Sequence, residues 1–153
     1  MKLITTLFVS AFFVLPNMAA EQAMCPIMPG VEIDEEEVVA YRGVEIYMCC
    51  AACARAWGAN PDYFAAAALA HDPDSPLLPQ LEGVELPEIE LMPQRFCPIN
   101  RTPAMVCPES PSVEYQGKTI YFFKASSVRR WERDPDGYFE KAREAGLLPQ
   151  YDE

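Results

Sequence analysis

The chain has 153 residues, of which 23 are acidic and 12 are basic, so its net charge at neutral pH is −11. Proteins that bind duplex nucleic acid neutralise phosphates with clustered Lys and Arg, and this acidic composition argues against that class. The length suffices for one ordinary domain or two very small ones. The six cysteines carry the most informative chemistry of the chain.

Residues 1–20 have the pattern of a secretory signal peptide. Lys2 supplies a positive start, residues 3–15 form an apolar run, and Ala19 and Ala20 offer a small-residue cleavage point. The run is shorter than the roughly 20 apolar residues that span a bilayer. We therefore expect a periplasmic or secreted protein with no stable membrane insertion. An uncleaved membrane tether is the alternative.

Two segments of the chain share one sequence pattern, about 74 residues apart. Residues 24–71 form the first predicted module and residues 96–148 the second. Residues 72–95 between them are rich in proline and acidic residues. This composition is typical of an extended, semi-rigid linker that forms no core of its own.

Each module is predicted to contain a β-hairpin followed by short helices. The β-rich runs are residues 38–41 and 44–48 in the first module, and 113–115 and 119–123 in the second. A helix should begin just after Cys50, and another at Asn60-Pro61-Asp62, because Asn caps, Pro fits the first turn and Asp complements the dipole. Asp134-Pro135-Asp136 repeats this start. The sequence thus predicts an α+β fold of two small tandem modules.

Cys25, Cys49, Cys50 and Cys53 form the candidate metal site. The last three surround a predicted helix start, and the hairpin returns the chain so that Cys25 joins them. At a helix start the dipole and the free backbone N–H groups favour thiolate over thiol. Three or four sulfurs in one shell select soft or borderline ions such as Cu(I) and zinc.

The second module lacks these thiols at the matching positions. Phe123, Lys124 and Ser127 stand where the first module has Cys49, Cys50 and Cys53. Aromatic positions persist in both modules, as Trp57 and Trp131 illustrate, which indicates that the aromatic residues form the core. The cysteines that only one copy retains are therefore predicted to have a chemical role.

The first module resembles a known family of metal-binding modules. The motifs Cys25-Pro-Ile-Met28, Tyr41-x-Gly43, Tyr47-Met48-Cys49-Cys50-Ala-Ala-Cys53 and Asn60-Pro61-Asp62-Tyr63 are similar to those of the YHS domain and the related TRASH modules. The resemblance covers about 45 residues and recurs in degenerate form in the second module. It implies zinc-ribbon-like or treble-clef-like modules that bind a heavy metal. Cys25, Cys49 and Cys53 match the family's cysteine positions, and Cys50 fits a variant with doubled cysteine.

The leading functional hypothesis is an exported protein that captures or hands over a soft metal ion, copper in preference to zinc. A metal-transport or metal-resistance protein would be its partner. One alternative is a structural zinc module, or a metal-free module for protein–protein contact. Another is a thiol–disulfide redox protein using Cys50 and Cys53, which the neighbouring Cys49 thiol disfavours. No catalytic constellation stands out, so we expect a binding protein and no enzyme.

Four residues outside the cysteine cluster have candidate roles. Cys97 and Cys107 lie ten residues apart, and in an exported protein we expect a disulfide between them, with metal ligation as the alternative. His71, the only histidine, is a candidate fourth ligand or a complement to a helix dipole. Met28 is a candidate thioether ligand, because thioethers suit Cu(I) better than zinc.

Overall fold

The computed structural model describes residues 21–72 and 76–152. The predicted signal peptide, residues 1–20, lies outside this part of the chain. Among the described residues, no helix has the length and apolar character needed to cross a membrane. The described chain contains four α-helices and two antiparallel two-stranded sheets, which is an α+β architecture.

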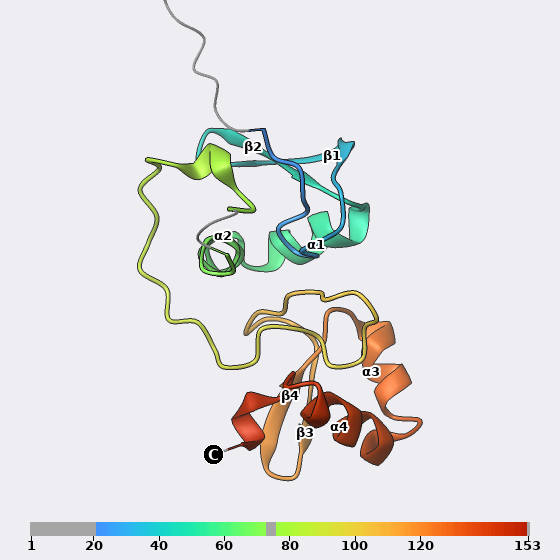
Figure 1. Cartoon of the computed structure of the whole chain (residues 1–153). Helices are drawn as coiled ribbons and strands as arrows, with labels where there is room; N and C mark the ends of the chain where they lie inside the picture. Colours follow the sequence, from blue (N-terminus) through green and yellow to red (C-terminus); the bar gives the residue numbers. More distant parts are fainter. Residues whose placement is uncertain (1–20, 73–75, 153) are drawn as a thin grey trace, which may run out of the picture.

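The first unit consists of a hairpin, two helices and a short 3-10 helix (Figure 1). Its elements are β1 (Asp34–Tyr41), β2 (Val44–Met48), α1 (Ala51–Ala59), α2 (Pro61–Leu69) and η1 (Pro79–Leu81). In the hairpin turn Arg42 and Gly43 have φ values of +48° and +83°, the left-handed conformations that a tight two-residue turn requires. Strand β1 begins earlier than predicted, with an irregular register between Asp34 and Val38.

The second unit repeats this order of elements. It comprises β3 (Ser112–Tyr115), β4 (Lys118–Tyr121), α3 (Ala125–Trp131), α4 (Pro135–Glu144) and η2 (Pro149–Tyr151). Its turn residues Gln116 and Gly117 have φ values of +48° and +78°, close to those of the first hairpin. The predicted second strand, residues 119–123, began one residue late and ran two residues past the end of β4 at Tyr121.

The helix starts confirm the predictions from the capping residues. The side chain of Asn60 accepts the N–H of Tyr63 at 3.0 Å, and the side chain of Asp134 accepts the N–H of Gly137 at 3.1 Å. Both capping residues have a φ of −157°. Each cap satisfies a backbone donor that the helix itself leaves unpaired, so the two helices begin at equivalent points.

A buried glutamine joins the start of each unit to its hairpin. The side-chain amide of Gln22 bonds to both the N–H (3.0 Å) and the carbonyl (2.7 Å) of Tyr47. Gln94 makes the same pair of bonds to Tyr121, at 3.0 and 2.7 Å. Both glutamines therefore act as an extra strand residue beside the hairpin, and each unit begins a little before its predicted boundary.

Part of the predicted linker, residues 72–95, belongs to the first unit. Leu77, Leu78 and Leu81 are buried, and Gln80 of η1 donates to the side chain of Gln22 at 2.6 Å. Gln150 of η2 makes the corresponding bond in the second unit. The proline-rich composition of this segment is typical of an exposed connection, but its three leucines complete the core of the first unit. Residues 84–92, by contrast, form neither helix nor strand.

Aromatic pairs form the centre of each unit, as the sequence predicted. Trp57 meets Tyr41 edge to face, with ring centroids 5.4 Å apart, and Trp131 meets Tyr115 in the same way at 5.5 Å. Both tryptophans are buried. Edge-to-face packing suits the charge distribution of aromatic rings, and it fixes α1 and α3 against their hairpins.

The second unit packs against the first through its irregular N-terminal segment, which lies between the two hairpins in Figure 1. The N–H of Met105 donates to the carbonyl of Ile27 at 2.7 Å. The side chain of Asn60 donates to Glu109 at 3.0 Å. The second unit therefore contacts both the N-terminal loop of the first and the start of α2.

The predicted disulfide between Cys97 and Cys107 is wrong, because both are free and buried. The N–H of Cys97 donates to the carbonyl of Ala104 at 2.8 Å, so those two residues lie opposite each other. Cys107 is three residues further along, about 10 Å in extended chain. A disulfide requires Cα atoms within about 7 Å. The register of this segment therefore separates the two thiols.

Candidate metal centre

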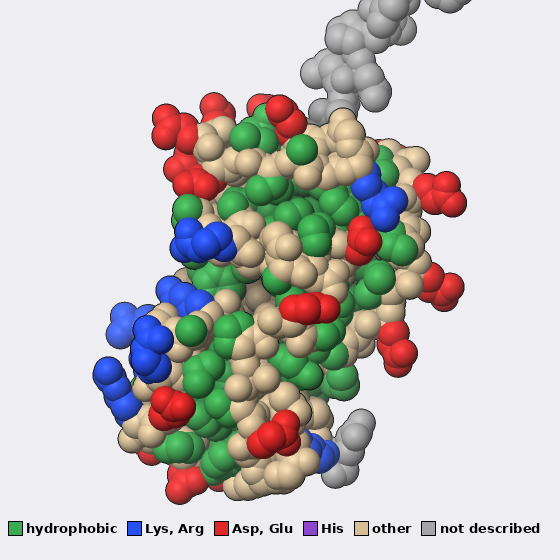
Figure 2. All heavy atoms as spheres, turned by 180° about the vertical axis from the view of Figure 1, so that it is seen from behind, with side chains coloured by type: hydrophobic (Ala, Val, Ile, Leu, Met, Phe, Trp, Pro, Cys, Tyr) green, Lys and Arg blue, Asp and Glu red, His purple; other side chains and the backbone are tan. Residues whose placement is uncertain are grey.

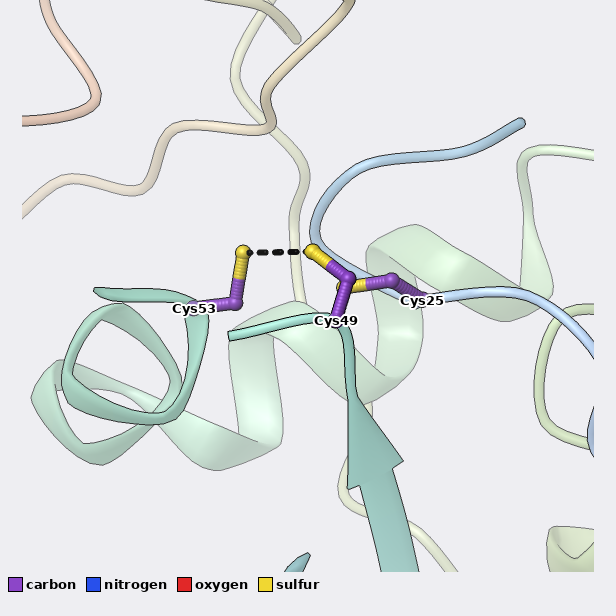
Figure 3. A group of neighbouring side chains, drawn as sticks. All are labelled: Cys25, Cys49 and Cys53. Carbon is purple, nitrogen blue, oxygen red and sulfur yellow. Dashed lines mark hydrogen bonds between the residues drawn. The ribbon is translucent and has the colours of Figure 1, made fainter. Parts of the chain in front are cut away.

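Three separate segments bring Cys25, Cys49 and Cys53 together (Figure 3). Cys25 lies in the N-terminal loop, Cys49 directly follows β2, and Cys53 lies in the first turn of α1. Their Sγ atoms all lie within 4.8 Å of one another, and those of Cys49 and Cys53 are 3.5 Å apart. These three thiols are close enough to hold a metal ion.

A tight loop positions Cys25. Its N–H donates to the carbonyl of Val31 at 2.8 Å, and the N–H of Val31 donates to the carbonyl of Met28 at 3.1 Å. Between them, Pro29 and Gly30 occupy the central positions of the turn, and Gly30 has a φ of +85°. Proline followed by a left-handed glycine is the preferred pair of a type II turn. We call residues 25–31 the knuckle loop.

Cys50 lies beside the three mutually close thiols. Its Sγ is 3.9 Å from that of Cys49 and 3.8 Å from that of Cys53. Four sulfurs bound tetrahedrally at about 2.3 Å from zinc would be about 3.8 Å from one another. The Sγ atoms of Cys49, Cys50 and Cys53 are therefore spaced like three corners of such a tetrahedron. The Sγ atom of Cys25 lies within 4.8 Å of those of Cys49 and Cys53.

The cluster has a buried side and an accessible side. Cys25 and Cys53 are fully buried, at 0% exposure, whereas Cys49 and Cys50 are partly exposed. An ion held by these thiols would be fixed by the buried pair. An incoming ligand would approach past the exposed pair.

The surroundings lower the pKa of two of the thiols. The hydrogen bond with Cys53 and the backbone N–H groups of Cys49, Met28 and Ile27 outweigh burial and lower the pKa of Cys25 to about 6. Burial opposes ionisation of Cys50, but the backbone N–H groups of Cys53 and Ala52 lower its pKa overall. Both thiolates are stabilised by donors at a loop and at a helix start, as expected for such positions.

The pKa of the other two thiols is raised. Burial and the neighbouring charge of Cys25 raise the pKa of Cys49 to about 12. The hydrogen bond to Cys25, together with burial, raises the pKa of Cys53. The principal contributions to these shifts come from burial, backbone groups and other thiols. Without a cation, the cluster therefore retains protons on Cys49 and Cys53.

The structure places two of the other candidate ligands, His71 and Cys107, outside this cluster. The ring of His71 packs edge-on against Phe96 of the second unit, with centroids 5.7 Å apart. Cys107 accepts a bond from Ser110 at 3.5 Å. Neither His71 nor Cys107 belongs to the group of side chains that could hold one ion together, which is Cys25, Cys49 and Cys53.

The second unit has the same backbone arrangement without the thiol cluster. Phe123 and Ser127 are buried at the positions of Cys49 and Cys53, and the ammonium of Lys124 lies 5.8 Å from the Phe123 ring centre. Cys97 corresponds to Cys25, because each donates its N–H across an equivalent loop. This correspondence was missed from the sequence. Its signal is the tripeptide Cys-Pro-Ile, which occurs at 25–27 and again at 97–99.

No family model, curated protein or solved structure matches this chain. The function of the cysteine cluster is therefore inferred from its geometry and from the contrast between the two units.

Metal affinity is expected to rise with pH, because a thiol must lose its proton to ligate. At pH 7.5 Cys25 is already a thiolate, since its pKa is about 6, whereas the raised pKa values keep Cys49 and Cys53 protonated. Binding of Zn²⁺ by these three should release about two protons at pH 7.5 and about three below pH 5. Calorimetric titrations in buffers of different ionisation enthalpy measure this number. Release of no proton at pH 7.5 would contradict the assignment.

Proposed function

We propose that this protein is an exported carrier of a soft metal ion, with Cu(I) as the favoured cargo and zinc as the alternative. The observation that carries the proposal is the convergence of Cys25, Cys49 and Cys53 within 4.8 Å from three segments of the chain. Cys50 adds a fourth thiol at the accessible side. A donor set made only of sulfur suits Cu(I) best, and zinc next.

The second unit supports cargo binding over a structural metal. It forms the same order of hairpin, helices and 3-10 helix with Phe123, Lys124 and Ser127 in place of three of the thiols. Structural zinc sites commonly supply the folding free energy of small modules. Here the repeated aromatic core stabilises a unit that lacks the ligands. The metal in the first unit is therefore free to be exchanged without loss of the fold.

The distribution of charge also favours capture of a cation. Residues 21–92 contain 14 acidic and two basic residues, whereas residues 93–153 contain nine of each. Figure 2 shows Lys and Arg side chains gathered on one side of the second unit, where α3 carries Arg129 and Arg130. A negative field around the first unit raises the local concentration of metal cations and speeds their arrival.

The finer fold assignment belongs to the same proposal. A knuckle loop, a hairpin and a helix whose first turn carries a ligand are the parts of a treble-clef-like module, and they support the resemblance to YHS and TRASH modules. On this proposal the second unit is a degenerate copy that no longer binds metal. The partner would be a metal-transport or metal-resistance protein in the periplasm that accepts the ion from the exposed Cys49 and Cys50.

The proposal is tested by titrating the purified, reduced protein with Cu(I) and with Zn²⁺ in the presence of competing chelators. We expect one Cu(I) per chain, bound more tightly than Zn²⁺, and a circular dichroism spectrum that is unchanged when the metal is removed. Unfolding on metal removal would favour the structural zinc alternative. Failure to bind either ion, with reversible pairing of Cys50 and Cys53, would favour the redox alternative.

A further inference from the structure

Met28 lies at the accessible edge of the cysteine cluster. Its Sδ atom is 3.9 Å from the Sγ of Cys49, the same separation as that between the sulfurs of Cys49 and Cys50. Its neighbour Ile27 is fully buried, whereas Met28 is only partly buried. The core of the unit is therefore filled by Ile27, and the thioether of Met28 faces the thiols.

The knuckle loop fixes Met28 and Cys25 together. The carbonyl of Met28 accepts the N–H of Val31 at 3.1 Å, and the N–H of Cys25 donates to the carbonyl of the same Val31 at 2.8 Å. The N–H of Met105 anchors the intervening Ile27 at 2.7 Å. These bonds fix the backbone from which the Met28 side chain reaches the cluster before any ion arrives, which reduces the cost of ordering a ligand on binding.

The second unit provides an internal comparison for this position. Its loop retains Cys97, Pro98 and Ile99, and Ile99 is buried as Ile27 is. The next residue is Asn100, where the first unit has Met28. The copy that lost the partner thiols thus also lost the thioether, while it kept the core residue beside it. This pattern groups Met28 with the ligands and not with the core.

We propose that Met28 is a thioether ligand that makes the cluster select Cu(I) over Zn²⁺. The inference depends on the proposed function, because it assumes that the ion binds at Cys25, Cys49 and Cys53. A thioether is a soft donor, which Cu(I) accepts readily and zinc rarely uses. It is also uncharged, so it completes the shell without adding to the negative charge of the thiolates in an acidic unit.

The test replaces Met28 with leucine, which has a similar volume and no sulfur. Met28→Leu should weaken Cu(I) binding about tenfold while Zn²⁺ affinity stays within about twofold. Met24→Leu is the matched control, because Met24 is a partly buried methionine of the same segment whose backbone pairs with Glu32. This control should leave both affinities unchanged. Thermal unfolding of the two variants checks that both remain folded.

A spectroscopic readout separates ligation from indirect effects. In selenomethionine-labelled protein loaded with Cu(I), selenium-edge X-ray absorption should show a Se–Cu distance that Met28→Leu abolishes and Met24→Leu retains. One Cu(I) bound by the unaltered chain, with neither a Se–Cu signal nor a loss of affinity in Met28→Leu, would overturn the role of Met28 and leave the proposed function intact. An unaltered chain that binds no Cu(I) would overturn both.

Discussion

Cys25→Ser is expected to lower metal affinity by at least about 100-fold, an effect as large as that of Cys53→Ser. The reason is that the Cys25 Sγ completes a shell with Cys49 and Cys53, all within 4.8 Å. A serine hydroxyl is a poor donor for a soft ion, so its introduction opens the shell on the buried side.

Cys97→Ser is the matched control for this prediction. Cys97 has the same place in the second unit as Cys25, is 1% exposed against 0%, and donates its N–H across an equivalent loop. The two substitutions should therefore perturb folding similarly, while only one changes metal binding. Competitive titration with Cu(I) and Zn²⁺ measures the affinities, and tryptophan fluorescence monitors the packing of Trp57 and Trp131.

Each alternative function predicts a different result for these variants. A redox pair at Cys50 and Cys53 predicts that Cys25→Ser has little effect on any activity. A structural zinc site predicts that Cys25→Ser unfolds the first unit and exposes Trp57. Unchanged metal affinity in a folded Cys25→Ser variant would contradict the assignment of the site.

The second large effect is a gain of function. Introducing Phe123→Cys and Ser127→Cys beside the native Cys97 should raise the stoichiometry from one to two metal ions per chain. Cys50 and Lys124 precede α1 and α3 with nearly the same backbone, at φ and ψ of −173° and 162° against −156° and 161°. The new thiols should therefore converge on Cys97 as Cys49 and Cys53 converge on Cys25.

This experiment needs controls for packing and for the number of thiols. Loss of the buried Phe123 ring should destabilise the second unit by about 3–4 kcal/mol, so the variant is tested at a temperature where it is folded. Phe123→Cys alone provides two thiols and should add no tight site. Combining the double substitution with Cys25→Ser isolates the new site. A folded double variant that still binds one ion would show that the repeat does not extend to the ligand geometry.

The second unit also has a supporting role that does not depend on ligands. Met105 holds the carbonyl of Ile27 in the knuckle loop, and Glu109 accepts a bond from Asn60 at the start of α2. Both contacts are made by the segment that carries Cys97 and Cys107. The second unit thus braces the N-terminal loop and the start of α2 in the first unit.

Local sequence was enough to predict the hairpins and the helix starts of both units. The Arg42-Gly43 turn set the first hairpin, and Asn60 and Asp134 marked helix starts, because turns and caps are decided by the backbone preferences of one to four residues. Cys49, Cys50 and Cys53 were predicted together for the same reason. Strand β2 ends at Met48 and helix α1 begins at Ala51, so the three cysteines at this junction must lie close together.

Tertiary structure decided the features that join distant segments. Gln22 and Gln94 pair with hairpin residues 25 and 27 positions away, and such single side-chain bonds leave no periodic pattern in the sequence. Burial of η1 and the register that separates Cys97 from Cys107 likewise depend on where the chain returns. The position of the Met28 thioether beside Cys49 belongs to this class. The sequence by itself determined which residues could be ligands, and the packing of the knuckle loop against the hairpin decided which of them meet.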